Sequence, residues 1–353
     1  MDFTFSEEQQ MMAAALRELT ADVCSPQVLR ARFDGTDQGS EERWQRLAEL
    51  GLFGVLAPGA AGGLGLGDAD FVLLAEEAGR AALPEPLAEQ AAVAVPVLAS
   101  LPAVAAAESL LPRLVTGAAR IGIVHPRNPL VNVPPGLTHW LLCEPERLAL
   151  ADAADVPAPV RRSIDAGRSL VEPVAAPGTG HTLATGERAS QLSAQVLNRG
   201  ALYAAAQCLG LAERMLEIAA AYARERQQFG RPIGSYQAVK HHLASAAVKL
   251  EFARPVVYAA ATTLGSATPR TAAQVAHAKL AAGDAADLAA RTAIQTHGAM
   301  GYSWEVDLHF FMKRAWALAG AWGERNYHAR QLQTLLVEGA LALGPDQTFA
   351  ASG

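Results

Sequence analysis

The sequence predicts a mainly α-helical fold with a small β insert in the middle of the chain. Apolar residues recur at helical spacing before about residue 117 and again after about residue 191. Between these parts, short apolar runs alternate with proline, glycine and asparagine, a pattern typical of short strands. The chain has 353 residues, of which 51% are hydrophobic and 18% charged. This composition provides enough apolar material for a large core.

The first predicted unit, residues 1–117, is an N-terminal helical domain. Ser6 and Gln9 have the spacing of a capping box, in which each side chain satisfies a free backbone N–H at a helix start. A second helix is expected over residues 41–50. A third is expected over residues 69–78, with Asp68 as its cap.

The second predicted unit, residues 118–190, is a reduced β domain. Strands are expected at residues 121–124 and 140–143, where short apolar runs are flanked by turn-forming residues. Prolines are frequent throughout this segment, and long strands are missing from the pattern. The segment therefore resembles an eroded sheet.

The third predicted unit, residues 191–343, is a C-terminal four-helix bundle. Long amphipathic helices are expected over residues 237–264, 270–298 and 306–342. The remaining residues, 344–353, are expected to form a mobile tail.

Composition excludes several classes of protein. The net charge is −6 and the pI is about 5.9, and no basic stretch suggests a nucleic-acid partner. The N-terminus lacks the features of a signal peptide, and no uninterrupted apolar run is long enough for a membrane span. Three cysteines without C-x-x-C spacing fit a reducing cytoplasm. Since His241 and His242 are adjacent on a predicted helix, they point to different faces, and no metal is expected.

Four motifs, in this order along the chain, resemble the acyl-CoA dehydrogenase family. The resemblance covers both helical parts but not residues 118–189, and it implies the family's helical–β–helical fold and FAD as cofactor. The motifs are DFTFSEEQQ (2–10), WQRLAELGLFG (44–54) followed by GGLGL (62–66), RERQQFGRPIGSYQAVKH (224–241) and QTHGAMGYSWE (295–305).

The last two motifs provide the candidate cofactor-binding residues. Arg226 precedes a glycine and proline turn, where a guanidinium can donate two parallel hydrogen bonds to a phosphate. Spacing alone favours a simpler interpretation, an exposed arginine beside a core phenylalanine. The resemblance implies instead that Arg226, Phe229 and Gln237 contact the FAD of a neighbouring subunit. It places Gln295 and Gly298 at the same cofactor, and glycine allows backbone to approach a ligand closely.

The catalytic base that the resemblance implies is missing. The family dehydrogenates acyl-CoA thioesters: a glutamate removes the α proton while the flavin accepts the β hydride. Two positions carry this glutamate in the family, and here they are Trp322, before Gly323, and Asn198, before Arg199. Neither an indole nor an amide can remove a proton from carbon. Glu324 is the only nearby substitute, and its simpler interpretation is a solvated carboxylate.

The middle segment also lacks the family's flavin-ring motifs, a Glu-Pro-Gly-Ala-Gly-Ser-Asp stretch and a Trp-Ile-Thr/Ser motif. Some actinobacterial members of the family form α2β2 heterotetramers acting on bulky CoA esters, including steroid side chains. Our main hypothesis is therefore a non-catalytic subunit that completes the FAD site of a homologous catalytic partner. One alternative is a self-sufficient homo-oligomeric dehydrogenase using Glu324 as base. Another is a flavin-free interaction protein with the same fold.

Overall fold

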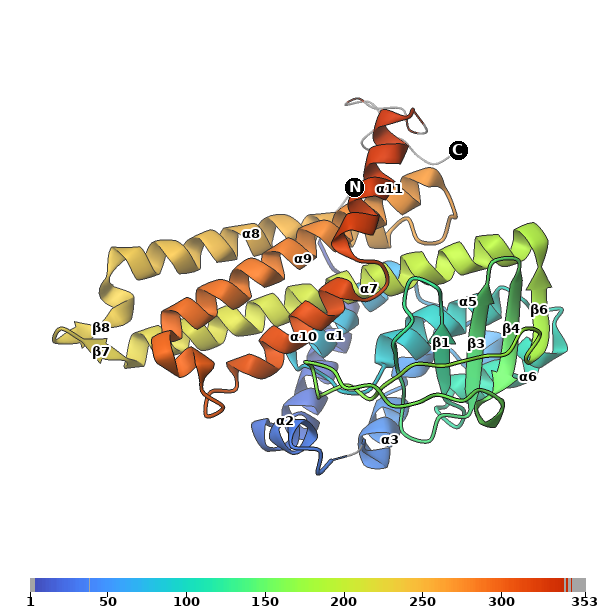
Figure 1. Cartoon of the computed structure of the whole chain (residues 1–353), viewed down its shortest axis with the longest axis horizontal. Helices are drawn as coiled ribbons and strands as arrows, with labels where there is room; N and C mark the ends of the chain where they lie inside the picture. Colours follow the sequence, from blue (N-terminus) through green and yellow to red (C-terminus); the bar gives the residue numbers. More distant parts are fainter. Residues whose placement is uncertain (1–3, 38, 340, 342–343, 345–353) are drawn as a thin grey trace.

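The computed structural model describes residues 4–37, 39–339, 341 and 344, and it is built around one long helix. This helix, α7 (Gly186–Glu225), packs against α8 (Gln237–Ala261), α9 (Pro269–His297) and α10 (Leu308–Gly320). Figure 1 shows these four helices side by side, with α11 (Arg325–Val337) projecting from them. The expected bundle is confirmed.

One predicted helix is wrong, because residues 306–342 form two helices rather than one. α10 ends at Gly320, and α11 begins at Arg325. Between them Trp322 has φ 57° and Gly323 has φ 94°. Two consecutive residues with positive φ cannot continue a right-handed helix, so the chain changes direction here.

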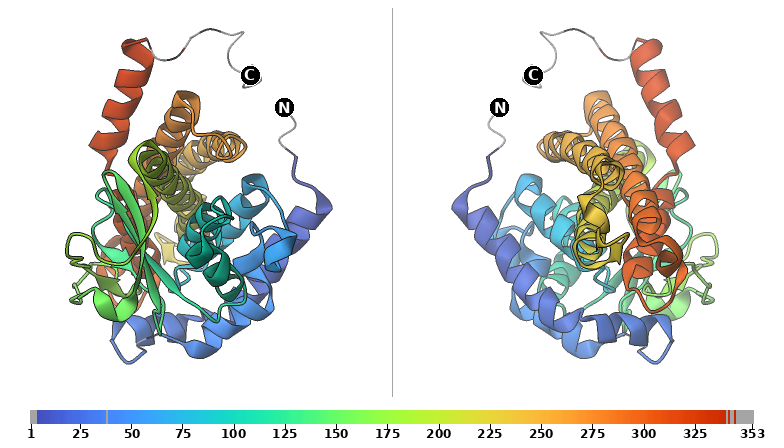
Figure 2. Two further views of the ribbon diagram at one scale, coloured as in Figure 1. Left: turned by 90° about the vertical axis from the view of Figure 1, so that its right-hand side faces the viewer. Right: turned by 90° about the vertical axis from the view of Figure 1, so that its left-hand side faces the viewer.

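The N-terminal helices lie on one side of the bundle, as Figure 2 shows in blue. The capping box is confirmed: Ser6 Oγ accepts from the Gln9 N–H at 3.2 Å, and Gln9 Oε1 accepts from the Ser6 N–H at 2.8 Å. The segment contains α1 (Glu7–Val23), α2 (Pro26–Phe33), α3 (Glu41–Glu49), α4 (Asp68–Arg80), a π-helical turn (Glu89–Ala94), α5 (Val95–Ala99) and α6 (Ala105–Val115).

The predicted cap of the third helix is wrong. α4 starts at Asp68 itself, and the N-cap is Gly67, whose N–H donates to Asp70 Oδ2 at 2.7 Å. The Asp68 carboxylate instead accepts from both amino groups of Arg199 on α7, at 2.5 and 3.1 Å. A carboxylate in the first helical turn is also favoured by the helix dipole. The dipole and the Arg199 ion pair therefore both favour an aspartate at this position.

A four-stranded sheet forms the middle of the chain, in the order β1-β3-β4-β6. β1 runs parallel to β3, and the other two pairs are antiparallel. The expected strands at 121–124 and 140–143 are confirmed. The bounds are β1 (Ile121–Val124), β3 (His139–Glu144), β4 (Arg147–Asp152) and β6 (His181–Thr185), with a separate short pair of β2 (Val131–Asn132) and β5 (Leu170–Val171).

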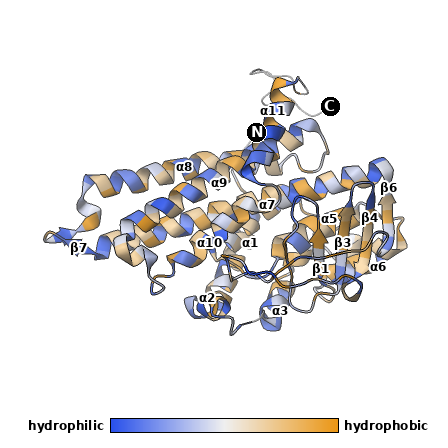
Figure 3. Ribbon diagram, viewed as in Figure 1, coloured by the Kyte–Doolittle hydropathy of each residue, from blue (hydrophilic) through white to orange (hydrophobic). Residues whose placement is uncertain are grey.

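The interior is alanine-rich, which lets helices approach closely. Figure 3 shows apolar residues along the inner faces of the bundle and hydrophilic residues at its β7 end. α4 and α7 come nearest at Gly79 and Gly210, where an added Cβ would overlap a backbone carbonyl oxygen of the other helix. The two glycines thus set the spacing between the N-terminal helices and the bundle.

Within the described residues, no helix combines the length and the apolar character needed to cross a membrane. The cysteines Cys24, Cys143 and Cys208 are free and buried. Almost all of the tail expected at residues 344–353 lies outside the described residues. We retain the division of the chain after residues 117 and 190 as a proposal.

Replacing Gly210 with alanine should destabilise the fold by about 3 kcal/mol, because the new methyl group forces α4 and α7 apart. Chemical denaturation of the purified chain measures this change. Gly283→Ala on α9 is the matched control, since a Cβ there meets no atom within 4 Å. The control should be neutral or stabilising by up to about 1 kcal/mol. Equal effects of the two substitutions would contradict the role of Gly210.

Candidate functional site

The predicted cofactor contacts gather at one end of the bundle. Arg226 follows the last residue of α7, and Gln237 is the first residue of α8. Gln295 lies near the end of α9, and Gly298 follows that helix with φ 59°. The Tyr222 and His297 rings stack with centroids 4.3 Å apart, which joins the ends of α7 and α9. The structure therefore brings the two motifs together.

Phe229 occupies the tip of a hairpin made by β7 (Gln227–Gln228) and β8 (Arg231–Pro232). Phe229 and Gly230 have φ values of 55° and 79°, as a two-residue hairpin turn of type I′ requires. A phenylalanine in this conformation is strained, and its ring is 92% exposed. Such an outlier suggests a functional contact that covers the ring.

Arg226 is available to a ligand at the base of this hairpin. Its backbone is fixed, since its N–H donates to Tyr222 O at 2.9 Å and its carbonyl accepts from the Ile233 N–H at 2.8 Å. Its exposed guanidinium forms no ion pair with any described residue. A fixed backbone and a free guanidinium together make a ready site for a phosphate oxygen.

Trp322 occupies the position where the resemblance implies a catalytic glutamate, and its side chain is buried there. Its indole is 2% exposed and packs on Gly200 of α7, where an added Cβ would lie 2.5 Å from Trp322 Cε2. The Trp322 N–H donates to Asn128 Oδ1 at 3.2 Å, and the Gly323 N–H donates to Arg127 O at 3.1 Å. The loop after β1 is thus joined directly to the loop after α10.

The second position, Asn198, lies half-buried on α7 beside a closed ion pair. Arg199 binds Asp68 and also donates to Ala92 O at 3.0 Å, and the Tyr203 hydroxyl donates to the same aspartate. Burial, followed by the Asp68 charge, raises the pKa of Tyr203 well above its usual value. Asp68 thus accepts hydrogen bonds from both Arg199 and Tyr203.

Glu324 is exposed at the N-terminus of α11, and its side chain does not cap the helix. The next residue, Arg325, forms an ion pair with Asp284. A base for proton removal from an acyl-CoA works in a closed, dry pocket. The position of Glu324 favours the simpler interpretation of a solvated carboxylate.

Two buried histidines surround the Trp322 loop. His328 Nε2 lies 3.0 Å from Trp322 O, and His125 lies with its ring centroid 6.3 Å from the indole. Burial, followed by the Lys279 charge, lowers the pKa of His328 to about 4. Burial, followed by the Arg127 charge, lowers the pKa of His125 to about 4. Both rings are thus neutral at pH 7.

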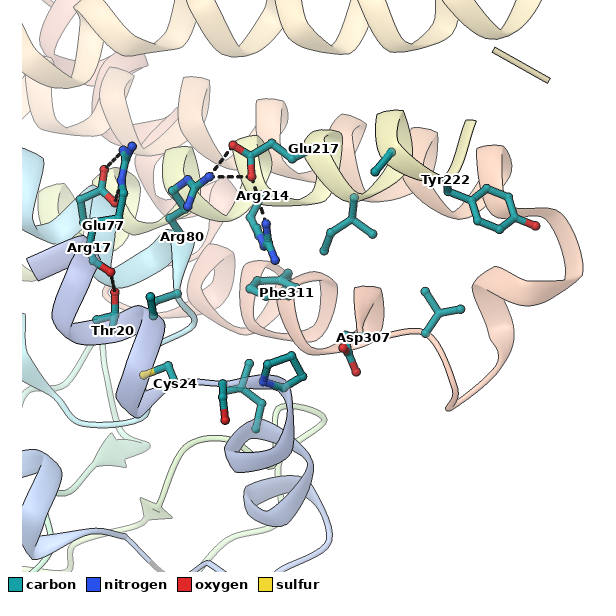
Figure 4. Close-up of a pocket in the computed structure, with 18 of the residues that line it drawn as sticks. Arg17, Thr20, Cys24, Glu77, Arg80, Arg214, Glu217, Tyr222, Asp307 and Phe311 are labelled. Atoms are coloured by element: carbon teal, nitrogen blue, oxygen red, sulfur yellow. Dashed lines mark hydrogen bonds and ion pairs between the residues drawn. The ribbon is translucent and has the colours of Figure 1, made fainter. Parts of the chain in front are cut away.

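A cavity of about 800 Å³ lies between the N-terminal helices and the bundle (Figure 4). Arg80 Nη2 donates to both Glu217 oxygens, at 2.5 and 2.7 Å, and Arg17 Nε donates to Glu77 at 2.9 Å. Tyr222 lines the opposite end, next to the predicted cofactor contacts. Sequence reasoning missed this cavity, because separate segments of the chain supply its walls.

Comparisons with known proteins agree with this architecture. The family model for the acyl-CoA dehydrogenase N-terminal domain matches residues 6–118, and the one for the C-terminal domain matches residues 190–336. The chain belongs to the acyl-CoA dehydrogenase family. Among the described residues, no group of three or more His, Cys, Asp or Glu side chains could hold a metal ion.

This acyl-CoA dehydrogenase family member is similar to two curated proteins of Mycobacterium tuberculosis and to a solved steroid ACAD. It is 33% identical to the acyl-CoA dehydrogenase IpdE2 of Mycobacterium tuberculosis over 88% of this chain and 91% of that protein. It is 31% identical to FadE34 of the same organism, over 86% of this chain and 44% of that protein. A variant of the Tcur3481-Tcur3483 steroid ACAD superposes with a TM-score of 0.81 at 26% identity, covering 95% of this chain and 99% of that one.

A double-mutant cycle tests the packing of Trp322 on Gly200. Gly200→Ala should destabilise the chain by about 2 kcal/mol, because the methyl group enters the space of the indole. In a Trp322→Gly background the same substitution should be nearly neutral, since the ring is gone. Denaturant titration of the four proteins gives the coupling. Additive effects would show that the two residues act independently.

Acid should destabilise the fold through His328. The unfolded chain takes up a proton near pH 6.5, while the folded form resists protonation to about pH 4. Stability is therefore full above pH 6.5 and is lost as pH falls toward 4. Between pH 7 and 4.5 the native chain should lose about 2 kcal/mol more than His328→Gln, measured by urea unfolding at each pH. Parallel pH profiles for the two proteins would contradict this assignment.

Proposed function

We propose that this chain is the non-catalytic subunit of an FAD-dependent acyl-CoA dehydrogenase, paired with a homologous catalytic subunit. Trp322 is the observation that carries the proposal, since it is buried where the family's base belongs. A self-sufficient dehydrogenase needs a carboxylate in that space. The similarity to a steroid ACAD supports a bulky acyl-CoA as substrate.

The residues at the bundle end fit half of a flavin site. Arg226, Phe229, Gln237, Gln295 and Gly298 would contact the diphosphate and adenosine of FAD held mainly by the partner. The strained, exposed Phe229 ring and the unpaired Arg226 guanidinium fit this role. When bound, FAD supplies a hydride acceptor for the acyl-CoA thioester.

The chain's own ring-binding region does not fit a flavin. In the family, motifs of the middle segment hold the isoalloxazine ring, and the late glutamate lies beside the flavin. Here the corresponding loops donate and accept hydrogen bonds directly, through Trp322, Gly323, Arg127 and Asn128. Since these groups already satisfy one another, they are not free to bind a ring. This arrangement supports one FAD per heterodimer.

Flavin stoichiometry tests the proposal. The chain alone should bind little FAD, while co-expression with the neighbouring-gene partner should give one FAD per heterodimer and dehydrogenase activity. The flavin absorption bands and the protein concentration give the ratio. If the chain alone bound FAD fully and oxidised acyl-CoA, the proposal would be wrong. A colourless, inactive complex would favour the flavin-free interaction protein.

Substitutions separate the remaining alternatives. Arg226→Ala should reduce FAD retention of the complex at least about tenfold, since it removes a charged hydrogen bond to phosphate. Arg188→Ala, on the exposed start of α7, is the matched control and should retain FAD.

Glu324→Gln should leave turnover unchanged. Lost turnover in Glu324→Gln, with FAD still bound, would instead identify Glu324 as a relocated base.

A further inference from the structure

A second cavity, of about 810 Å³, lies away from the bundle end, between the loop after α2 and the irregular chain around β5. Its walls include four arginines and two aspartates, so arginines outnumber the carboxylates that line it. These are Arg32, Arg161, Arg162 and Arg168, with Asp34 and Asp37. Neither the family resemblance nor the proposed subunit role assigns a function to this cavity.

Two of the four arginines serve the local structure. Arg32 Nη2 donates to Gly167 O at 3.1 Å and to Ser169 Oγ at 3.0 Å, which fixes the cavity wall to α2. Arg161 Nε donates to Glu172 at 2.6 Å on the exposed side. Arg162 has no ion-pair partner among the described residues, and Arg168 shares its partner, Asp165, with Arg314.

Arg168 is the central group of this cavity. Its side chain is only 9% exposed, and its Nε donates to Asp165 Oδ2 at 3.0 Å. Its two Nη atoms have no hydrogen-bond partner in the described part of the chain. The fully buried Asp165 is shared with Arg314 of α10, so one carboxylate serves two buried guanidinium groups.

The carboxyl group of Glu89 interacts electrostatically with Arg168 and Arg314 but does not pair directly with either. Glu89 forms no ion pair with another described residue, and burial raises its pKa. A buried guanidinium without a full counter-charge is costly. An anion entering the cavity would remove that cost and use the two vacant donors.

We propose that this cavity binds an oxyanion, with the two Nη atoms of Arg168 donating in parallel to two of its oxygens. A phosphate monoester or free phosphate has the required pair of oxygens at the spacing of a guanidinium fork. Arg162, exposed at the cavity wall, adds a second positive charge. The arrangement makes the cavity a phosphate site separate from the cofactor contacts.

Calorimetric titration of inorganic phosphate into the full chain tests this site, with chloride holding the ionic strength constant. Saturable binding is expected with a Kd on the order of 1 mM or tighter. Arg168→Met should weaken binding at least about tenfold, because it removes the paired donors. Arg46→Met, at a separate surface ion pair with Asp22, is the matched control and should bind as the native chain does.

A second variant covers the case in which Arg168→Met fails to fold. Ala166 is exposed and lines the cavity, so Ala166→Asp adds a repelling carboxylate without disturbing the buried charges. It should abolish phosphate binding, whereas Ala154→Asp, on an exposed turn that does not line the cavity, should not. The proposal is overturned if the native chain shows no saturable binding, or if Ala166→Asp binds phosphate normally.

Competition then identifies the source of the phosphate group. If CoA displaces phosphate and 3′-dephospho-CoA does not, the site takes the 3′-phosphate of a CoA nucleotide. If neither displaces it, the site takes the free ion. Both results rest on prior binding through Arg168, and neither depends on FAD stoichiometry, so the site can be tested apart from the proposed subunit role.

Discussion

The packing of the Trp322 indole on Gly200 is the contact on which the rest of the site depends. The positive φ of Trp322 costs about 1 to 3 kcal/mol. Burying an indole of roughly 150 to 250 Å², at about 25 cal/mol per Å², returns roughly 4 to 6 kcal/mol. Burial therefore outweighs the strain. Lys279 supports the same loop by donating to Leu318 O at the end of α10, where a cation is favoured by the helix dipole.

The Trp322 loop and the β7–β8 hairpin differ in which groups they leave exposed or without a partner. At the Trp322 loop, two backbone N–H groups donate to a side-chain oxygen and a backbone oxygen of the loop after β1, and the indole is buried. At the hairpin, Phe229 is strained and 92% exposed, and the nearby Arg226 guanidinium is unpaired. Since the hairpin leaves an exposed ring and an unpaired guanidinium, we propose it as the end that contacts a partner's cofactor.

Much of the fold and part of the candidate site could be predicted from the sequence. Helical periodicity located α8 and α9, and the spacing of Ser6 and Gln9 located the start of α1, because these depend on neighbours within one or two turns. The break between α10 and α11 could not be predicted. Residues 306–342 show an unbroken helical pattern in the sequence. The break depends on the packing of Trp322 on Gly200 of α7, a residue far from it in the sequence.

The sequence by itself determined the family and the absence of a carboxylate at Trp322 and Asn198, since residue identity alone decides whether a side chain can take a proton. Only the tertiary structure decided that the Trp322 indole is buried at the position of the missing carboxylate. The same holds for the pairing of Asp68 with Arg199 and for the burial of Arg168 with two vacant donors. Each of these depends on segments distant in sequence meeting in a packed interior. There, burial and hydrogen-bond geometry, which no local pattern records, fix the state of each polar group.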